Sequence, residues 1–384
     1  MRVLVTGGAG FIGARLSRHL VSRGHAVRVL DNLSPQIHGP DALTRPGPLQ
    51  QLRAEVELVV GSVTDPEVWR QAIAGQDAVV HLAAETGTGQ SMYESDRYVQ
   101  VNVSGTALML DALGTLRNSV SKVVVSSSRA VIGEGAYRDG AGRIVFPPSR
   151  RDRDLSQGRF GLYCETTGEE LESVPTDESA PFQPTSVYGI TKQAQEQLVT
   201  TGCAALGRAF VALRYQNVYG PGQSLSNPYT GLLSIFSTRL LSGRGIEVFE
   251  DGEESRDFVF IDDVVAATTA ALERDAANNH VIGIGSGTRT SVLQAARGLA
   301  AALGCEPELR ISGRYRLGDI RHNCADLSRA RQALGYVPTV TFEEGLRRFV
   351  AWVREQGPGS DGYERSLEEL GARGMLRGAR AHHE

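Results

Sequence analysis

Apolar residues fall into short continuous runs that alternate with longer stretches in which they recur every three or four positions. The short runs, rich in Val and Leu, predict strands over 2–6, 25–31, 56–60, 78–83, 122–127 and 210–214. The longer stretches predict helices over 12–22, 94–116, 187–206, 262–274, 291–303 and 342–355. Strands that alternate with helices in this way are typical of an α/β fold with a doubly wound parallel sheet.

The predicted strands are apolar at nearly every position, as in the runs 27–30 (Val-Arg-Val-Leu) and 122–125 (Lys-Val-Val-Val). Parallel strands that are covered by helices on both faces have this composition. Strands of an antiparallel sandwich alternate more cleanly between apolar and polar residues. The pattern therefore favours a parallel sheet with two helical layers.

Two segments break the alternation of strands and helices. The first, about 134–184, is rich in Gly, Arg, Glu and Pro and is too long for an ordinary connection, so we predict an insertion. Its Arg150-Arg151-Asp152-Arg153 cluster suits either a phosphate or, as the better interpretation, a solvated charged surface. The second, 357–384, contains a short polar helix near 363–370, and we expect it to be a peripheral tail.

A glycine-rich turn joins the first predicted strand to the first predicted helix. Gly7, Gly10 and Gly13 lie three residues apart in the sequence TGGAGFIG. The first glycine permits a tight turn, the second lets a pyrophosphate approach the backbone, and the third allows close helix packing. The free N–H groups at the helix N-terminus favour the anionic ligand. This position between strand and helix predicts dinucleotide binding rather than a bare structural turn.

Asp31, at the end of the second predicted strand, indicates which dinucleotide is bound. A carboxylate about 20 residues after the glycine turn suits the adenosine ribose hydroxyls. It would repel a 2'-phosphate, and the following residues, Asn32-Leu33-Ser34, include no arginine to accept one. The sequence therefore predicts NAD rather than NADP.

The overall composition narrows the class of partner. A net charge of −4 with both signs interspersed provides no basic surface for nucleic acid or for an anionic membrane. There is no apolar stretch of about 20 residues, and a strand begins at residue 2 where a cleavable leader would lie. Four scattered cysteines suit reduced thiols, so we assign no disulfide and no metal. We expect a cytoplasmic protein with a small-molecule partner.

Lysine is almost absent, with only Lys122 and Lys192 among 40 basic residues. Lys192 follows Tyr188 by four residues, which puts both side chains on one face of a predicted helix. A compact ammonium there can hold a nicotinamide ribose and lower the tyrosine pKa, so that the phenol exchanges protons with a sugar hydroxyl. Lys122 is interpreted as an ordinary charge at a strand entrance. A third group, a hydroxyl, is expected at the end of a strand, where Ser126, Ser127 and Ser128 stand.

Seven sequence blocks follow one another along the chain: TGGAGFIG, HLAAE, SSSRAVIG, YGITK, RYQNVYGPG, RDFVFIDDV and GDIRH. In this order the chain resembles the extended short-chain dehydrogenase/reductase family, in its nucleotide-sugar epimerase and dehydratase group, from residue 1 to about 355. The resemblance implies an NAD-binding Rossmann domain over 1–215 and about 256–285. It further implies a smaller α+β domain for the nucleotide sugar over about 216–255 and 286–356.

The resemblance also implies roles for individual residues. The catalytic residues would be Ser128, Tyr188 and Lys192. Residues that would contact NAD, besides Tyr188 and Lys192, are Gly7, Gly10, Phe11, Ile12, Gly13, Asp31, Asn32, Ser62, Val63, Leu82, Ala83, Ala84 and Asn102. Residues that would contact the nucleotide sugar are Ser91, Ser127, Ser128, Asn217, Arg256 and Arg316, with Tyr93 nearby.

The block around Ser128 bears on the type of reaction. The 4,6-dehydratases of the group carry an Asp-Glu pair directly after the catalytic hydroxyl, whereas this chain has Arg129 and Ala130. An arginine cannot serve as a proton donor and acceptor pair, so the resemblance favours a 4-epimerase that passes through a 4-keto sugar. A nucleotide-sugar 4-ketoreductase or dehydrogenase stays open as an alternative. A non-catalytic NAD sensor would have no reason to keep the Ser, Tyr and Lys together.

Two further features refine the resemblance. Ser62 stands where the group usually has an aspartate near the adenine. The sequence around the insertion is similar to 4-epimerases that act on dTDP-6-deoxyhexoses, although their insertion tends to carry several cysteines and this one has only Cys164. The helices over 94–116 and 187–206 resemble those that form a homodimer interface in the family, so a homodimer is expected.

Overall fold

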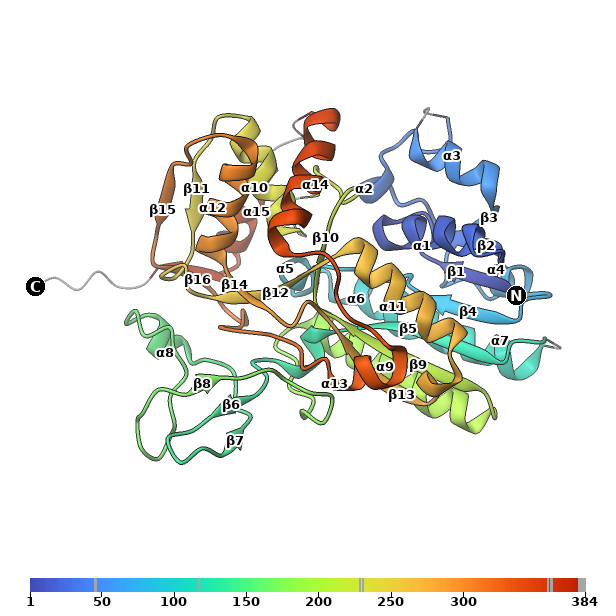
Figure 1. The fold of residues 1–384 in the computed structure, drawn as a ribbon, viewed down its shortest axis with the longest axis horizontal. Helices are drawn as coiled ribbons and strands as arrows, with labels where there is room; N and C mark the ends of the chain where they lie inside the picture. The colour runs from blue at the N-terminus through green and yellow to red at the C-terminus, as the bar shows by residue number, and fades with distance from the viewer. Residues whose placement is uncertain are drawn as a thin grey trace, which may run out of the picture.

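The computed structural model describes residues 1–44, 47–116, 118–227, 229, 231–357, 359 and 362–378. Its larger lobe is built on a seven-stranded parallel sheet with the strand order β13-β9-β5-β4-β1-β2-β3 (Figure 1). The strands are β1 (Arg2–Thr6), β2 (Ala26–Asp31), β3 (Glu57–Val60), β4 (Ala78–His81), β5 (Lys122–Ser128), β9 (Ala209–Tyr215) and β13 (His280–Ile284). The order reverses between β1 and β4, and doubly wound sheets bind ligands at such a switch point.

Helices cover both faces of this sheet because successive residues of each strand point to opposite sides. One face carries α1 (Phe11–Ser22) and α11 (Ile261–Glu273), and the other carries α4 (Pro66–Ile73), α7 (Gly105–Thr115) and α9 (Val187–Ala205). In β1, for example, Val3 and Val5 belong to the first core, whereas Leu4 belongs to the second. All three side chains are fully buried, as the apolar strand sequences predict.

The smaller lobe consists of segments that leave the sheet after β9 and after β13. Its elements are β10 (Asn217–Tyr219), α10 (Leu232–Leu241), β11 (Ile246–Val248), β12 (Ser255–Phe260), β14 (Arg289–Ser291), α12 (Val292–Leu303), β15 (Leu309–Ile311), β16 (Arg314–Arg316) and α14 (Phe342–Gln356). Helix α13 (Ser328–Leu334) returns to the larger lobe, where it packs against β13 and α11. Strand β12 joins β10 and β14 in one small sheet, and β11 pairs with β15 in another. The apolar core of this lobe is continuous with the core under α1 and α11.

The insertion forms a small unit that lies below the smaller lobe in Figure 1. Its strands β6 (Tyr137–Arg138), β7 (Ile144–Val145) and β8 (Glu172–Ser173) form an antiparallel sheet. The short helix α8 (Asp152–Leu155) lies between β7 and β8 in the chain. Arg150 is buried and pairs with Glu250 at 2.7 Å and with Glu134 at 3.4 Å. Neither interpretation of the arginine cluster holds for this residue, because its guanidinium joins the insertion to the smaller lobe.

The tail residues that the structure describes, 362–378, pack against the rest of the chain, whereas a peripheral tail was predicted. The expected helix is present as α15 (Tyr363–Ala372), and it is followed by β17 (Leu376–Gly378), which pairs with β16. Tyr363, Leu367, Leu370 and Leu376 are buried in an apolar cluster of their own. The sequence did not predict this packing, because the single apolar face of a short polar helix does not indicate which part of the chain it packs against.

The predicted strands and helices of the larger lobe are present within one or two residues, apart from the helix expected over 94–116, and the sequence pattern did not predict α3 (Pro48–Glu55) or α4. Strand β13 was not predicted, although it completes the sheet beside β9. The helix expected over 94–116 is divided into α6 (Ser95–Tyr98), a π-helical stretch (Val99–Ser104) and α7. Within the described residues, none of the helices has the length and apolar character that crossing a membrane requires.

Candidate active site

The glycine turn after β1 is packed too closely for larger residues. A Cβ atom on Gly13 would lie 2.1 Å from the Gly7 carbonyl oxygen, and one on Gly7 would lie 2.8 Å from the Ala83 nitrogen. Gly7 also has a φ of 65°, which favours glycine. Gly10, by contrast, is open, because its Cβ would approach only the Gly7 oxygen, at 3.3 Å. The turn is therefore closed toward the protein and open toward a ligand.

The start of α1 offers unpaired donors beside this turn. No side chain caps the helix, whose first residues are Phe11 and Ile12. N–H groups at such a terminus suit a pyrophosphate. Asp31, at the end of β2, accepts hydrogen bonds from the Ala9 and Leu33 nitrogens at 3.0 and 2.9 Å, which fixes its carboxylate at the rim of the turn. The residues present therefore fit a dinucleotide with an unphosphorylated ribose.

Loops after β3 and β4 form the rest of this edge. Ser62 is bonded to Thr64 at 2.8 Å, and Val63 is buried next to it. After β4, Leu82, Ala83 and Ala84 pass beside the glycine turn, where the Ala83 nitrogen donates to Thr6 Oγ1 at 3.2 Å. Asn32 follows Asp31 and accepts from the Ser34 nitrogen at 3.1 Å. The predicted cofactor residues are thus brought to one edge of the sheet.

Asn102 holds the loop after β4 in place. Its side chain accepts from the Glu85 nitrogen at 2.7 Å and donates to the Glu85 carbonyl oxygen at 3.1 Å and to Thr191 Oγ1 at 3.0 Å. It lies in the π-helical stretch, and such stretches are common at functional sites. Asn102 therefore links this loop to α9 rather than presenting a free amide.

Three contacts place Tyr188 in the first turn of α9. Ser186 caps the helix by accepting from the Gly189 nitrogen at 3.1 Å, and the buried Ser91 hydroxyl accepts from the Tyr188 nitrogen at 3.0 Å. A Cβ on Gly189 would lie 2.6 Å from the Ala130 oxygen, so the glycine lets α9 approach the turn that follows Ser128. In this position Ser91 orients the backbone at Tyr188.

The pKa of Tyr188 is raised, which differs from the expectation. Burial raises it, whereas the Ser128 hydroxyl and the positive charge of Arg129 act in the opposite direction. The lowering influence was assigned to Lys192, and the structure instead gives it to Ser128 and Arg129. No hydrogen bond or ion pair ties the Arg129 guanidinium to another group in the described part of the chain. Sequence reasoning treated Arg129 only as a missing acid.

Lys192 is 2% exposed, on the same face of α9 as Tyr188 and one turn further on. Its ammonium donates to Gln195 Oε1 at 2.5 Å and lies 3.5 Å from Ser126 Oγ. Burial lowers the pKa of Lys192 to about 7, against the opposing charge of Glu196. Gln195 was not predicted, although its position three residues after the lysine is a usable signal.

Gln195 belongs to a buried chain of polar groups that leads back to the glycine turn. Its amide donates to Thr106 Oγ1 at 2.9 Å, and Thr106 lies 3.1 Å from His81 Nε2. The other ring nitrogen of His81 lies 2.7 Å from Thr6 Oγ1. Burial lowers the pKa of His81 to about 3, which keeps the ring neutral. The cofactor loop and the lysine are thus held by one network.

The Ser127 hydroxyl takes no part in the hydrogen bonds of Lys192 and Gln195 that are described above. Its hydroxyl donates to Glu196, whose carboxylate also pairs with Arg214 at 2.8 Å. All three side chains are buried. A buried charge pair needs such additional hydrogen bonds. We therefore leave Ser127 out of the candidate substrate site.

Two of the six residues expected to contact the nucleotide sugar share an internal partner. Arg256 and Arg316 each donate to Asp319, at 2.7 and 2.8 Å. Burial alone would raise the pKa of Asp319, but the charges of Arg316 and Arg256 hold it well below its usual value. Asn217 lies at the start of β10, and its buried Oδ1 has no hydrogen-bonding partner in the described part of the chain. The buried Nε of Arg316 likewise has none there.

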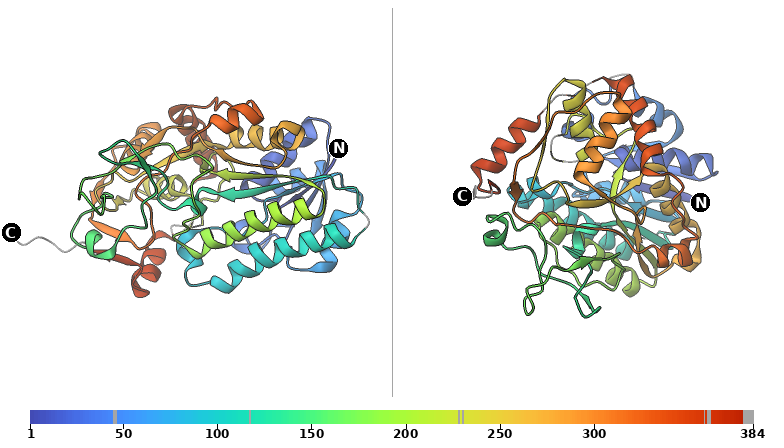
Figure 2. Two further views of the ribbon diagram at one scale, coloured as in Figure 1. Left: turned by 90° about the horizontal axis from the view of Figure 1, so that it is seen from below. Right: turned by 60° about the vertical axis from the view of Figure 1, so that its left-hand side comes forward.

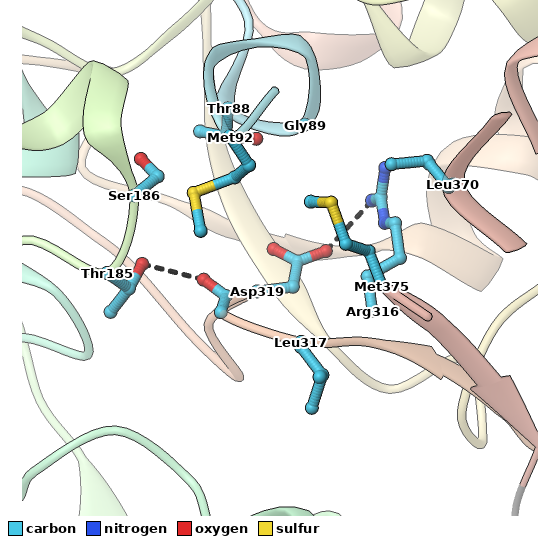
Figure 3. A pocket seen from close by; sticks show the side chains of 11 residues that line it. Thr88, Gly89, Met92, Thr185, Ser186, Arg316, Leu317, Asp319, Leu370 and Met375 are labelled. Atoms are coloured by element: carbon cyan, nitrogen blue, oxygen red, sulfur yellow. Dashed lines mark hydrogen bonds and ion pairs between the residues drawn. The ribbon is translucent and has the colours of Figure 1, made fainter. Parts of the chain in front are cut away.

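A pocket lies beside Asp319, between the two lobes (Figure 3). Residues from five segments line it: Thr88, Gly89, Met92, Thr185, Ser186, Arg316, Leu317, Gly318, Asp319, Leu370 and Met375. Thr185 donates to the Gly318 oxygen at 2.6 Å and thereby joins the segment before Tyr188 to the smaller lobe. The pocket is therefore bordered by the start of α9 on one side and by the tail on another.

Comparison with known proteins gives the site its context. A model of the "NAD dependent epimerase/dehydratase family" matches residues 3–150 and 162–285, which is well over half of the chain. The protein belongs to this family. The unmatched residues between the two segments fall within the insertion. The predicted family, the fold class and the NAD cofactor are confirmed.

Relatives of this epimerase/dehydratase family member include a dTDP-L-rhamnose 4-epimerase from Burkholderia thailandensis. It is 41% identical over 357 residues, which cover 92% of this chain and 95% of the relative. A UDP-glucose 4-epimerase from Thermotoga maritima, solved with UDP-glucose, has a TM-score of 0.72 at 30% identity and covers 93% of this chain and 99% of its own. A Thermus thermophilus UDP-glucose 4-epimerase solved with NAD has a TM-score of 0.71 at 27% identity, with 92% and 99% covered.

Proposed function

We propose that this family member inverts C4 of a dTDP-linked 6-deoxyhexose. The broader activity is that of an NAD-dependent nucleotide-sugar 4-epimerase, an isomerase. The finer substrate class is supported by the relative that is named a dTDP-L-rhamnose 4-epimerase and spans nearly the whole chain. The observation that carries the proposal is the interaction of the Ser128 hydroxyl with Tyr188, which lies one turn before Lys192 on the same face of α9.

In the proposed mechanism Tyr188 exchanges the proton of the C4 hydroxyl. Ser128 hydrogen-bonds the same oxygen, and its hydroxyl together with the Arg129 charge favours the ionised phenol against the effect of burial. When bound at the glycine turn, NAD would supply the hydride acceptor and donor that C4 inversion requires. Because the 4-keto sugar would turn over before the hydride returns, C4 would be inverted, and Tyr188 would give its proton back to the C4 oxygen.

The buried network behind α9 supports a positioning role for Lys192. Gln195 and Ser126 direct its ammonium, and burial keeps water from it, so a ribose hydroxyl would meet a cation that is already positioned. On the sugar-nucleotide side, Arg256 and Arg316 have the planar guanidinium groups that suit a diphosphate. Both guanidinium groups pair with Asp319. When the substrate binds, Asp319 would release them to the phosphates or share them. Asn217 Oδ1, which has no partner among the described residues, can accept a hydrogen bond from a hydroxyl or N–H of the nucleotide sugar rather than from its phosphates.

The test is incubation of the purified protein with NAD and a panel of dTDP-, UDP- and GDP-sugars, followed by NMR of the anomeric protons. We expect interconversion of dTDP-L-rhamnose and its C4 epimer with no net NADH. Stoichiometric NADH formation or consumption would instead identify a 4-ketoreductase or dehydrogenase. Inversion of UDP-hexoses alone would contradict the dTDP-6-deoxyhexose assignment.

Tyr188→Phe is the matched variant for this assay. It removes one oxygen while keeping the ring that contacts Tyr98 edge-to-face at 6.5 Å. We expect turnover to fall by at least about 1,000-fold, because the proton-transfer group is lost, while NAD binding is retained. Appreciable activity in Tyr188→Phe would remove this residue from the mechanism.

A homodimer is part of the same proposal. Helices α7 and α9 lie side by side at the surface (Figure 2), and exposed apolar residues there include Val99, Ile190 and Leu206 at 40, 54 and 37%. Pairing two copies through these helices would cover that surface. We also propose a cytoplasmic location, which suits the four free cysteines. Sedimentation velocity would test the dimer directly.

A further inference from the structure

The tail lies in contact with three parts of the molecule that surround the pocket. Leu317 donates through its backbone nitrogen to the Met375 oxygen at 3.0 Å, next to the pairing of β16 with β17. Glu369 accepts from the Tyr93 hydroxyl at 3.1 Å, on the loop that carries Ser91. Arg377 donates to Asp152 of the insertion at 2.6 Å. The tail is therefore held by the larger lobe, the smaller lobe and the insertion together.

The side chains that the tail places in the pocket are apolar. Leu370 is 8% exposed, and a Cβ on Gly89 of α5 (Thr88–Ser91) would lie 3.5 Å from its Cδ2. In Figure 3, Met375 and Met92 enter the pocket from different elements, near Asp319. Two thioethers and one leucine make a soft apolar wall, and flexible methionines adapt to irregular ligands.

The opposite walls of the pocket are polar. Arg316 and Asp319 form one of them, and Thr185 and Ser186, which directly precede Tyr188 by three and two residues, form another. A ligand whose C4 oxygen reaches Tyr188 and whose phosphates reach Arg316 would place the remaining sugar substituents between these two. The apolar wall then faces a part of the sugar where a hydroxyl or carboxylate would find no hydrogen-bonding partner from Met92, Leu370 or Met375.

We propose that the tail, 362–378, completes the sugar pocket and that Leu370 and Met375, with Met92, select a C6 methyl group over a C6 hydroxyl or carboxylate. This inference rests on the proposed 4-epimerase function and assigns it a substrate class. An apolar wall rejects an added hydroxyl only moderately, so the discrimination it provides is about 10- to 100-fold. The tail is therefore a specificity element and adds no group to the proton transfer.

The test uses the full-length protein with NAD and two substrates, dTDP-L-rhamnose and its 6-hydroxy counterpart dTDP-L-mannose. Met375→Gln keeps the length of the side chain and introduces an amide at the wall. We expect its kcat/KM ratio for the two substrates to fall by about tenfold, because the 6-deoxy sugar loses an apolar contact and the 6-hydroxy sugar gains a partner. Met375→Leu should keep the ratio of the unchanged protein.

Glu368→Gln is the matched control, since Glu368 is exposed on α15, the helix that carries Leu370 and precedes Met375. Leu370→Gln repeats the test from the buried position, and the partly exposed Met375 keeps the experiment decisive if Leu370→Gln does not fold. An unchanged ratio in Met375→Gln, or an equal loss on both substrates, would overturn the inference while the 4-epimerase activity stands. Wild-type protein that inverts only UDP-hexoses would also overturn it. Absence of activity on every nucleotide sugar would instead refute the proposed function.

Discussion

The two sides of the candidate site are built on different principles. On the cofactor side, buried polar groups satisfy one another, as in the chain from Thr6 through His81 and Thr106 to Gln195. On the sugar side, Arg256 and Arg316 share the single carboxylate of Asp319, while a buried oxygen of Asn217 has no partner in the described residues. A completed network is rigid before the ligand arrives, whereas shared and unused groups are ready to rearrange around one.

This difference matches what each side has to do. NAD is unchanged over a catalytic cycle and benefits from a preformed cradle, while the ketone has to present both of its faces to the hydride. A sugar that turns over needs a pocket without a single tight set of hydrogen bonds. The apolar wall formed by Met92, Leu370 and Met375 suits that requirement because, in the proposed site, it would contact the sugar without directional bonds.

The rigidity of the cofactor side can be broken at Gly13. In Gly13→Ala the new Cβ would lie 2.1 Å from a backbone oxygen, so the first turn of α1 must move. We expect a loss of about 3 kcal/mol in the free energy of unfolding, measured by urea denaturation, and no detectable NAD binding. Gly10→Ala is the control, because its Cβ has room on the protein side; it should stay folded and bind NAD more weakly. Equal stability of the two variants would contradict a closed cradle.

The same contrast decides how much the sequence could predict. Glycine spacing, Asp31 and the Tyr188–Lys192 pair are local signals on one strand–turn–helix unit or one helix, and the structure has them where the sequence places them. Ser127 was grouped with Ser128 by adjacency alone, and the two hydroxyls have different partners. No spacing rule distinguishes neighbouring serines whose partners come from distant elements.

On the sugar side, Arg256 and Arg316 were predicted, whereas Asp319 and the tail residues beside it come from separate segments and were not. Asp319 was seen only as part of a block, and its two arginines approach it from β12 and β16. Leu370 and Met375 were assigned to a peripheral tail because a polar helix of one apolar stripe resembles any surface helix. Their role depends on which loop the stripe faces, and that is a property of the folded chain alone.

The second prediction sharpens the comparison at Lys192. Lys192→Arg places a larger, planar cation in a space where the ammonium meets Gln195 and Ser126. We expect kcat to fall about 100-fold with the NAD complex weakened, measured in the epimerase assay and by titration with NAD. Full activity of Lys192→Arg would show that no compact ammonium is required.

Lys122 provides the matched control for this substitution. It is also buried, but its ammonium donates to the oxygens of Ala271, Leu272 and Arg274 at the end of α11. It therefore acts as a helix cap rather than as the simple strand-entrance charge that was predicted. Lys122→Arg should lower the melting temperature and leave kcat per folded molecule unchanged. A similar loss of kcat in both variants would mean that the Lys192 effect is structural.

The smallest expected effect concerns Arg129, whose positive charge lowers the pKa of Tyr188. Burial raises the pKa of Tyr188 and Arg129 opposes this, so removing the charge in Arg129→Met should raise that pKa further. Because the ionised phenol is the base in the proposed mechanism, the rising limb of kcat/KM against pH should move to higher pH, with the rate at high pH retained. Arg129→Lys keeps a positive charge and should leave the limb near its original position. An unmoved limb in Arg129→Met would show that the Arg129 charge does not lower the pKa of Tyr188 and would leave that effect to Ser128.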